Sequence, residues 1–176
     1  MLDSVCIKLQ KLERSFDNGK IVKEGIKTAI IGKPNAGKSS LLNAILKEDR
    51  AIVTEYAGTT RDTIEEFATV EGIPLKLIDT AGIRNANDEV EKIGIAKSRE
   101  IAKEADLIIA IFDSSCELTE EDMEILDIIK GKKAIVVLNK MDLSSKINEK
   151  MDCFKEFSEN IVKISALNQD GLENLY

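Results

Sequence analysis

The sequence contains no histidine, and its three cysteines, Cys6, Cys116 and Cys153, show no C-x-x-C spacing. A catalytic triad built on histidine is therefore excluded, and so is a zinc site made of cysteine and histidine ligands. Basic residues are also in the minority, with 25 Lys and Arg against 32 Asp and Glu, for a formal net charge of -7. Because proteins hold nucleic acids by neutralising phosphates with basic side chains, we do not expect this chain to bind RNA or DNA unaided.

Long apolar runs are absent as well. No stretch approaches the roughly 20 apolar residues that a membrane-spanning helix needs, and the segment 1–20 is too charged for a secretory signal. We therefore expect a cytoplasmic protein. With 176 residues, of which 43% are hydrophobic, the chain is long enough for one well-buried domain.

Short β-branched runs alternate with helical patterns along most of the chain. Strands are expected at 27–31, 73–79, 107–113, 134–139 and 161–165, and helices from Gly37, near 90–102, near 119–129 and, as a short piece, before the last strand. This alternation predicts an α/β fold with a mostly parallel sheet covered by helices on both faces. The segment 63–70 follows a long loop and is expected to form an edge hairpin with 73–79.

A glycine-rich segment, "GKPNAGKS" at 32–39, lies between an expected strand and an expected helix. In that context, backbone N–H groups surround phosphate oxygens at a helix N-terminus. Lys38 would reach the β- and γ-phosphates, and Ser39 would offer its hydroxyl to Mg²⁺. A glycine-rich turn that binds nothing is the alternative, which the complete motif disfavours. The predicted phosphate-binding residues are Asn35, Ala36, Gly37, Lys38, Ser39 and Ser40.

The segment "NKMD" at 139–142 follows a buried strand and predicts the base. The Asp142 carboxylate can accept hydrogen bonds from guanine N1–H and from its exocyclic amine, whereas adenine presents no such pair of donors. Asn139 suits the N7 and O6 side, Lys140 can lay its stem over the ring, and the segment "SAL" would bring the Ala166 amide near O6. An ordinary polar turn is the alternative for "NKMD" alone. The predicted base-binding residues are Asn139, Lys140, Asp142, Ser165, Ala166 and Leu167.

The segments "DTAGIR" and "YAGTTRD" predict contacts to the metal and the γ-phosphate. Asp79 would hold Mg²⁺ through water, Gly82 would bring its amide to the γ-phosphate, and Thr60 would give Mg²⁺ a second hydroxyl. A plain loop residue is the alternative for Thr60. Ile83 stands where Ras-like GTPases carry the glutamine that orients the attacking water. Since Ile83 has no hydrogen-bonding side-chain atom, another group must position that water, or none does.

Together these segments resemble P-loop GTPases of the TrmE-Era-EngA-YihA-septin type, and most of all the GTPase domain of the MnmE/TrmE family. The resemblance spans about residues 25–172, and "GTTRD" with "DEVEKIG" carries it most specifically. It implies a Ras-like fold with a six-stranded sheet and GTP hydrolysis. Members of the family modify the wobble uridine of certain tRNAs with a flavoprotein partner, so tRNA and an MnmG-like flavoprotein are the partners implied for the full-length protein.

The resemblance also implies how the missing glutamine is replaced. A potassium ion near the phosphates would be held by the Asn35 side chain and by the backbone carbonyls of Thr54 and Tyr56, in a transient dimer of two GTPase domains. Glu91 matches the family's carboxylate that positions water. The residues alone leave an alternative for each position. Asn35 could equally be an amide that caps its loop, and Glu91 could equally be one of the acids that favour the start of a helix. The predicted catalytic residues are Lys38, Thr60, Gly82 and Glu91.

The ends of the chain suggest a part of a longer protein. Apolar residues recur at helical spacing from Leu2 to Phe16, so residues 1–24 are interpreted as a helical lead-in and 25–176 as the GTPase domain, whose last helix is cut short. Two other functions stay open. One is a ribosome-assembly GTPase of the Era or EngA type. The other is a guanine-nucleotide scaffold that does not hydrolyse GTP, which stays open because Ile83 replaces the glutamine.

Overall fold

The computed structural model describes residues 24–47, 66–80, 94–147 and 151–175. Strands and helices alternate along this part of the chain, as predicted. The elements are β1 (Ile26–Ile31), α2 (Lys38–Lys47), β2 (Glu66–Val70), β3 (Ile73–Ile78), α4 (Gly94–Glu104), β4 (Leu107–Asp113), α5 (Glu120–Ile129), β5 (Ala134–Asn139), α6 (Met151–Lys155), β6 (Ile161–Lys163) and the 3-10 turn η3 (Leu172–Asn174).

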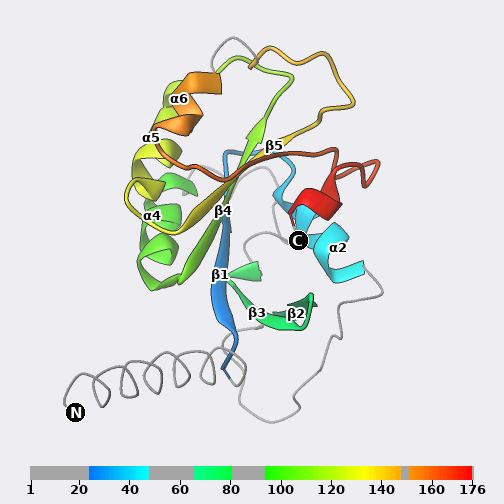
Figure 1. The fold of residues 1–176 in the computed structure, drawn as a ribbon. Helices are drawn as coiled ribbons and strands as arrows, with labels where there is room; N and C mark the ends of the chain where they lie inside the picture. The colour runs from blue at the N-terminus through cyan, green and yellow to red at the C-terminus, as the bar shows by residue number, and fades with distance from the viewer. Residues whose placement is uncertain (1–23, 48–65, 81–93, 148–150, 176) are drawn as a thin grey trace, which may run out of the picture.

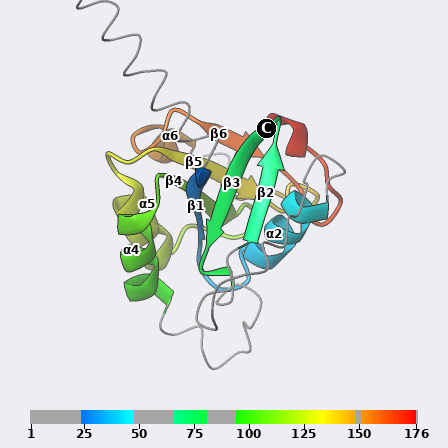
Figure 2. The ribbon, with the colours of Figure 1, turned by 90° about the horizontal axis from the view of Figure 1, so that it is seen from below.

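The strands form one six-stranded sheet in the order β2-β3-β1-β4-β5-β6. All neighbouring pairs are parallel except β2 and β3, which are antiparallel and lie side by side in Figure 2. Glu71 and Gly72 connect β2 to β3 with φ angles of 49° and 83°. Two successive residues with positive φ make the tight turn that suits twisted strands. The predicted edge hairpin is therefore confirmed.

Side chains of the central strands alternate between two apolar cores. Along β4, Ile108, Ala110 and Phe112 belong to one core, while Ile109 and Ile111 belong to the other. Helices α4, α5 and α6 lie on the first side of the sheet and α2 on the second (Figure 1). A strand buried on both faces reads as a nearly continuous hydrophobic run, which is why "LIIAIFD" predicts it. Helices on both faces are confirmed.

The predictions for the two ends of the chain, a helical lead-in and a last helix that is cut short, stay predictions. The helical lead-in at 1–24 lies outside the described residues except for Glu24, and the domain boundary after it stays a prediction. At the other end, the described chain has the short turn η3, which buries Leu172 against the second core. No helix within the described ranges is long and apolar enough to cross a membrane.

Candidate functional site

The sheet brings residues from five separate segments to one edge. Gly32 follows β1, Asp79 follows β3, Asp113 and Asn139 end β4 and β5, and Ser165 lies just beyond β6. Because these five strands are parallel, their carboxyl ends share an edge. Ligands of parallel α/β sheets bind at that edge, so the candidate site is the carboxyl edge of the sheet.

The phosphate loop turns sharply between β1 and α2. Asn35 and Gly37 have left-handed backbones, with φ angles of 59° and 105°, and the Leu41 amide donates to the Gly37 carbonyl at 2.9 Å as α2 begins. A Cβ atom on Gly37 would collide with the side-chain amide of Asn139. Glycine is therefore required here for the loop to approach β5, and the loop leads into a helix N-terminus, where anions are favoured.

Lys38 holds its ammonium group within the phosphate loop. Its Nζ donates to the carbonyl oxygens of Gly32, at 2.9 Å, and Lys33, at 2.8 Å. The loop thus places a positive charge between its own carbonyls, and phosphate oxygens are stronger acceptors for that charge than neutral carbonyls are. This position favours the predicted role of Lys38 toward the phosphates.

Asn139 ties the phosphate loop to the loop after β6. Its Nδ2 donates to the Ala36 carbonyl at 2.9 Å, and its Oδ1 accepts from the Ala166 amide, also at 2.9 Å. The side chain is only 2% exposed. Asn139 and Ala166 therefore lie together at the predicted base edge, but their hydrogen bonds run between two loops. The motifs predict that both groups contact the base, and they do not reveal these hydrogen bonds between the loops.

Asp142 is held from the same loop. The Ser165 hydroxyl donates to Asp142 Oδ1 at 2.6 Å, and it accepts from the Asn168 amide at 3.2 Å. Asp142 itself is exposed, so its carboxylate is oriented by Ser165 while remaining accessible. The side chain of Leu167, the last predicted base contact, is 79% exposed.

Asp113 is a residue of the site that sequence analysis missed. Its carboxylate forms an ion pair with Lys140 Nζ at 2.6 Å. It also accepts hydrogen bonds from the Ser115 amide and hydroxyl. Burial alone would raise the pKa of Asp113, but the hydrogen bonds from Lys140 and Ser115 and the lysine charge outweigh it and lower the pKa. Asp113 thus anchors the ammonium group of Lys140, and the predicted contact of its stem with a base stays a prediction. Asp113 ends the buried strand β4, beside β5, and a carboxylate at that point of the sequence could have indicated a residue of the site.

The two described ligands predicted for Mg²⁺ come from neighbouring parts of the edge. Ser39 lies exposed at the start of α2, and Asp79 follows β3, which pairs with β1. A hydroxyl and a carboxylate fit Mg²⁺, which binds few protein oxygens and takes the rest from phosphates and water. Within the described ranges, no group of three or more His, Cys, Asp or Glu could hold a metal. Asp79, with φ of 57°, instead pairs with Lys97 of α4, Nζ to Oδ2 at 2.8 Å.

Other predicted site residues lie outside the described part of the chain. They comprise the residues of the two switch segments and the water-positioning candidate, and their roles stay predictions: Thr54, Tyr56, Thr60, Gly82, Ile83 and Glu91.

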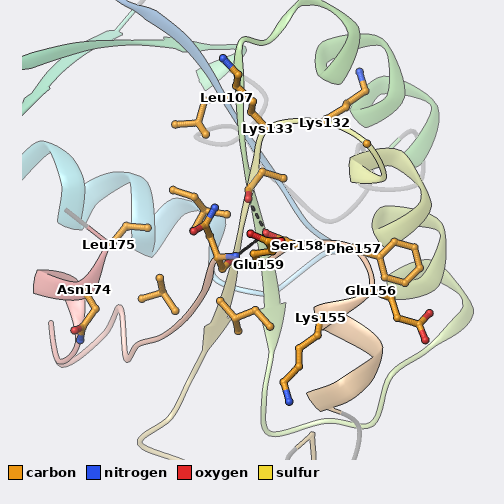
Figure 3. A pocket seen from close by; sticks show the side chains of 16 residues that line it. Leu107, Lys132, Lys133, Lys155, Glu156, Phe157, Ser158, Glu159, Asn174 and Leu175 are labelled. Carbon is orange, nitrogen blue, oxygen red and sulfur yellow. Dashed lines mark hydrogen bonds between the residues drawn. The ribbon is translucent and has the colours of Figure 1, made fainter.

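A cavity lies at the opposite edge of the sheet. It measures about 930 Å³ and is lined by the first residues of β4, β5 and β6, namely Leu107, Ala134 and Ile161. Figure 3 shows Lys132, Lys133 and Lys155 around it. None of the predicted nucleotide-binding residues lines it, so this cavity is not the candidate site.

The fold and this edge define a class of protein. A phosphate loop after β1, with an oriented carboxylate beyond β5, is the arrangement of a P-loop protein that binds guanine nucleotides. Residues 27–140 match the family model described as "50S ribosome-binding GTPase". The chain belongs to this family and is a domain that hydrolyses GTP.

The chain is also similar to named relatives. It is 57% identical over 169 residues to the tRNA modification GTPase MnmE of Thermoanaerobacter sp. (strain X514), covering 95% of this chain and 36% of the relative. It is 52% identical over 175 residues to MnmE of Aquifex aeolicus (strain VF5), covering 99% and 38%. The resemblance to the MnmE family is confirmed. The chain spans little more than a third of these relatives.

A solved structure agrees with the fold. A variant of Era from Aquifex aeolicus, bound to GDP and AlF4-, is 32% identical with a TM-score of 0.60, over 85% of this chain and 54% of that chain. The predicted Ras-like α/β fold is confirmed.

Proposed function

We propose that this chain is the GTPase domain of an MnmE-type enzyme, whose GTP hydrolysis serves the modification of wobble uridine in tRNA. The identity of 57% to a named MnmE over 95% of the chain supports this role. The nucleotide part rests on one observation, the Asp142 carboxylate that Ser165 orients at 2.6 Å. Because the chain spans 36% of that relative, tRNA and an MnmG-like flavoprotein would contact other segments of a longer, cytoplasmic protein.

The alternative with the best support is a ribosome-assembly GTPase of the Era type. The family description names 50S ribosome binding, and a variant of Era shares the fold at 32% identity. The identity to MnmE is much higher, and "GTTRD" with "DEVEKIG" carries the same preference in the sequence. The MnmE role is therefore the one we propose.

Within this role, the described residues bind and orient GTP. Lys38 binds the phosphates from inside the loop, Ser39 and Asp79 supply oxygens for Mg²⁺, and Asp142 accepts both guanine donors while Asn139 fixes the two loops around the base. Mg²⁺, when bound, neutralises phosphate charge. The protein's own contribution is to hold these groups at one sheet edge before the nucleotide arrives.

Potassium is the proposed substitute for an arginine finger. The Asn35 side chain is exposed and makes no hydrogen bond with any other described residue, which supports an ion ligand over a loop cap. The carbonyls of Thr54 and Tyr56 would complete the site when two GTPase domains meet as a dimer. A cation there would neutralise charge that develops on the phosphates. Thr60 would then bind Mg²⁺ and the Gly82 amide would bind the γ-phosphate. Glu91 would position the attacking water, the task of the glutamine that Ile83 replaces.

The potassium proposal is tested by single-turnover GTP hydrolysis in KCl and in NaCl at equal ionic strength, over a range of protein concentrations. We expect potassium to accelerate hydrolysis on the order of 10²-fold, more steeply at higher concentration. Asn35→Ala should lose the stimulation and keep GDP affinity, while Asn43→Ala, an exposed amide on α2, should change neither. A hydrolysis rate that is the same in KCl and NaCl and at every protein concentration would refute both the potassium site and the dimer.

The role in tRNA modification needs a separate experiment. The matching segment of the Thermoanaerobacter enzyme is replaced by this chain, and the chimera is expressed in a strain that lacks MnmE. Mass spectrometry of tRNA should show modified wobble uridine, and a chimera with Lys38→Ala should not. A matched chimera with the Era GTPase domain controls for GTP hydrolysis alone. A chimera that hydrolyses GTP without restoring the modification would contradict the proposal.

A further inference from the structure

A buried ion pair joins the phosphate loop to α5. Lys33 Nζ lies 2.7 Å from Asp122 Oδ2, and the two side chains are 14% and 1% exposed. The residues are 89 positions apart in the chain. Removing two charges from water costs free energy that a well-packed apolar pair would not cost. Stabilisation of the fold therefore does not by itself account for this pair.

Asp122 is the fixed member of the pair. It is the third residue of α5, and its Oδ2 also accepts from the amide and the hydroxyl of Thr119, each at 2.8 Å, in a capping box. Its Oδ1 is buried and has no hydrogen-bond partner among the residues described. Because the α5 cap holds the Asp122 carboxylate in place, the ion pair fixes the position of the Lys33 side chain.

The backbone of Lys33 has a direct connection to the nucleotide machinery. Its carbonyl accepts from Lys38 Nζ at 2.8 Å and from the Ala36 amide at 3.3 Å. A chain of contacts thus runs from the α5 N-terminus through the Lys33 side chain to its carbonyl and on to the phosphate-binding lysine. A displacement of Lys33 would move the acceptor that holds Lys38.

We propose that Lys33 and Asp122 are positioning residues that shape the phosphate loop for the nucleotide without touching it. A loop already held in its binding shape avoids the ordering cost that a free loop meets when a ligand binds. Loss of either partner should therefore slow nucleotide association and weaken affinity, while preference for guanine, set at the other loops, should remain. This inference rests on nucleotide binding alone and not on the role in tRNA modification.

The experiment compares binding of fluorescent mant-GDP by stopped flow in the full chain. The variants are Lys33→Met, Asp122→Asn, the double substitution, and Lys33→Arg. Asparagine keeps an oxygen for Thr119, so the α5 cap is preserved. We expect each single variant to bind GDP about 10-fold more weakly, the double variant no more weakly than the worse single one, and Lys33→Arg to recover most of the loss. Lys132→Met removes another lysine that joins two elements, through the Ala102 carbonyl, and should leave affinity unchanged.

Two outcomes would overturn the proposal. If the two single losses multiply in the double variant, Lys33 acts on the nucleotide independently of Asp122. If affinity and association rate stay at the wild-type values while the melting temperature falls, the pair serves the fold alone. A variant too unstable to measure is replaced by Asp122→Glu, which keeps the charge and moves it, and which must also slow GDP association for the proposal to stand.

Discussion

The Ser165 hydroxyl donates to Asp142 Oδ1 at 2.6 Å, across 23 residues of chain. Ser165 also pairs through its backbone with Asp170, since each amide donates to the other's carbonyl, at 2.9 and 3.2 Å. The serine is therefore held by its own loop and in turn orients the carboxylate. In the proposed role of Asp142, selection of guanine should depend on both residues, because a carboxylate must face two base donors at once.

Substitution of either residue should reduce discrimination between GTP and ITP, which lacks the exocyclic amine. Asp142→Asn removes an acceptor for both guanine donors and should abolish the preference. Ser165→Ala frees the carboxylate and should weaken GTP binding by about tenfold, which corresponds to about 1.5 kcal/mol, the low end of the value of one hydrogen bond to a charged group. Competition binding with mant-GDP measures both nucleotides. Equal discrimination in all three proteins would contradict the assignment of Asp142 to the base.

Gly37→Ala should abolish nucleotide binding. The added Cβ would meet the Asn139 amide, and φ at this position is 105°, which alanine rarely adopts. Gly131→Ala is a matched control, because Gly131 also has positive φ, at 73°, but a Cβ there has no neighbour within 4 Å. The control should lose only about 1–2 kcal/mol of stability and keep GDP affinity. Titration with mant-GDP and thermal unfolding measure the two effects, and equal affinities in both variants would refute the close approach of the loops.

Lys97→Met should raise the apparent affinity for Mg²⁺. Lys97 Nζ lies 2.8 Å from Asp79 Oδ2, so in the proposed role of Asp79 the lysine would compete with Mg²⁺ for this carboxylate. The two side chains are 46% and 29% exposed, so solvent screens the pair and the expected change is small, about two- to fivefold. Dissociation of mant-GDP as a function of Mg²⁺ concentration measures it. Lys103→Met, in the last turn of the same helix, should have no effect. An unchanged Mg²⁺ dependence for Lys97→Met would show that the pair does not compete with the ion.

Most of the fold follows from the sequence because its central strands are buried on both faces. Continuous apolar runs such as those that hold Ile109 and Val137 have few alternatives to a parallel sheet core. The motifs at 32–39, 79–84, 139–142 and 165–167 then locate the candidate site, because each begins at or just after the end of a strand. The pairs that shape the site do not follow in this way. Lys140 and Asp113 are 27 positions apart, and nothing in either local sequence identifies the partner.

Acid should remove the contribution of Asp113 to stability. Its folded pKa is lowered, so the carboxylate stabilises the fold at pH values above its unfolded pKa, and this stabilisation is lost as the pH falls through the folded pKa. Asp113→Asn should therefore be less stable than wild type at pH 7, by about 1–3 kcal/mol for hydrogen bonds to a buried charge, and the difference should shrink in strong acid. Urea unfolding of both proteins at neutral and acid pH measures the difference. Asp127→Asn, an exposed residue of α5, is the control and should match wild type within about 0.5 kcal/mol at pH 7. A difference that persists unchanged in acid would mean that the Asp113 carboxylate does not stabilise the fold through its charge.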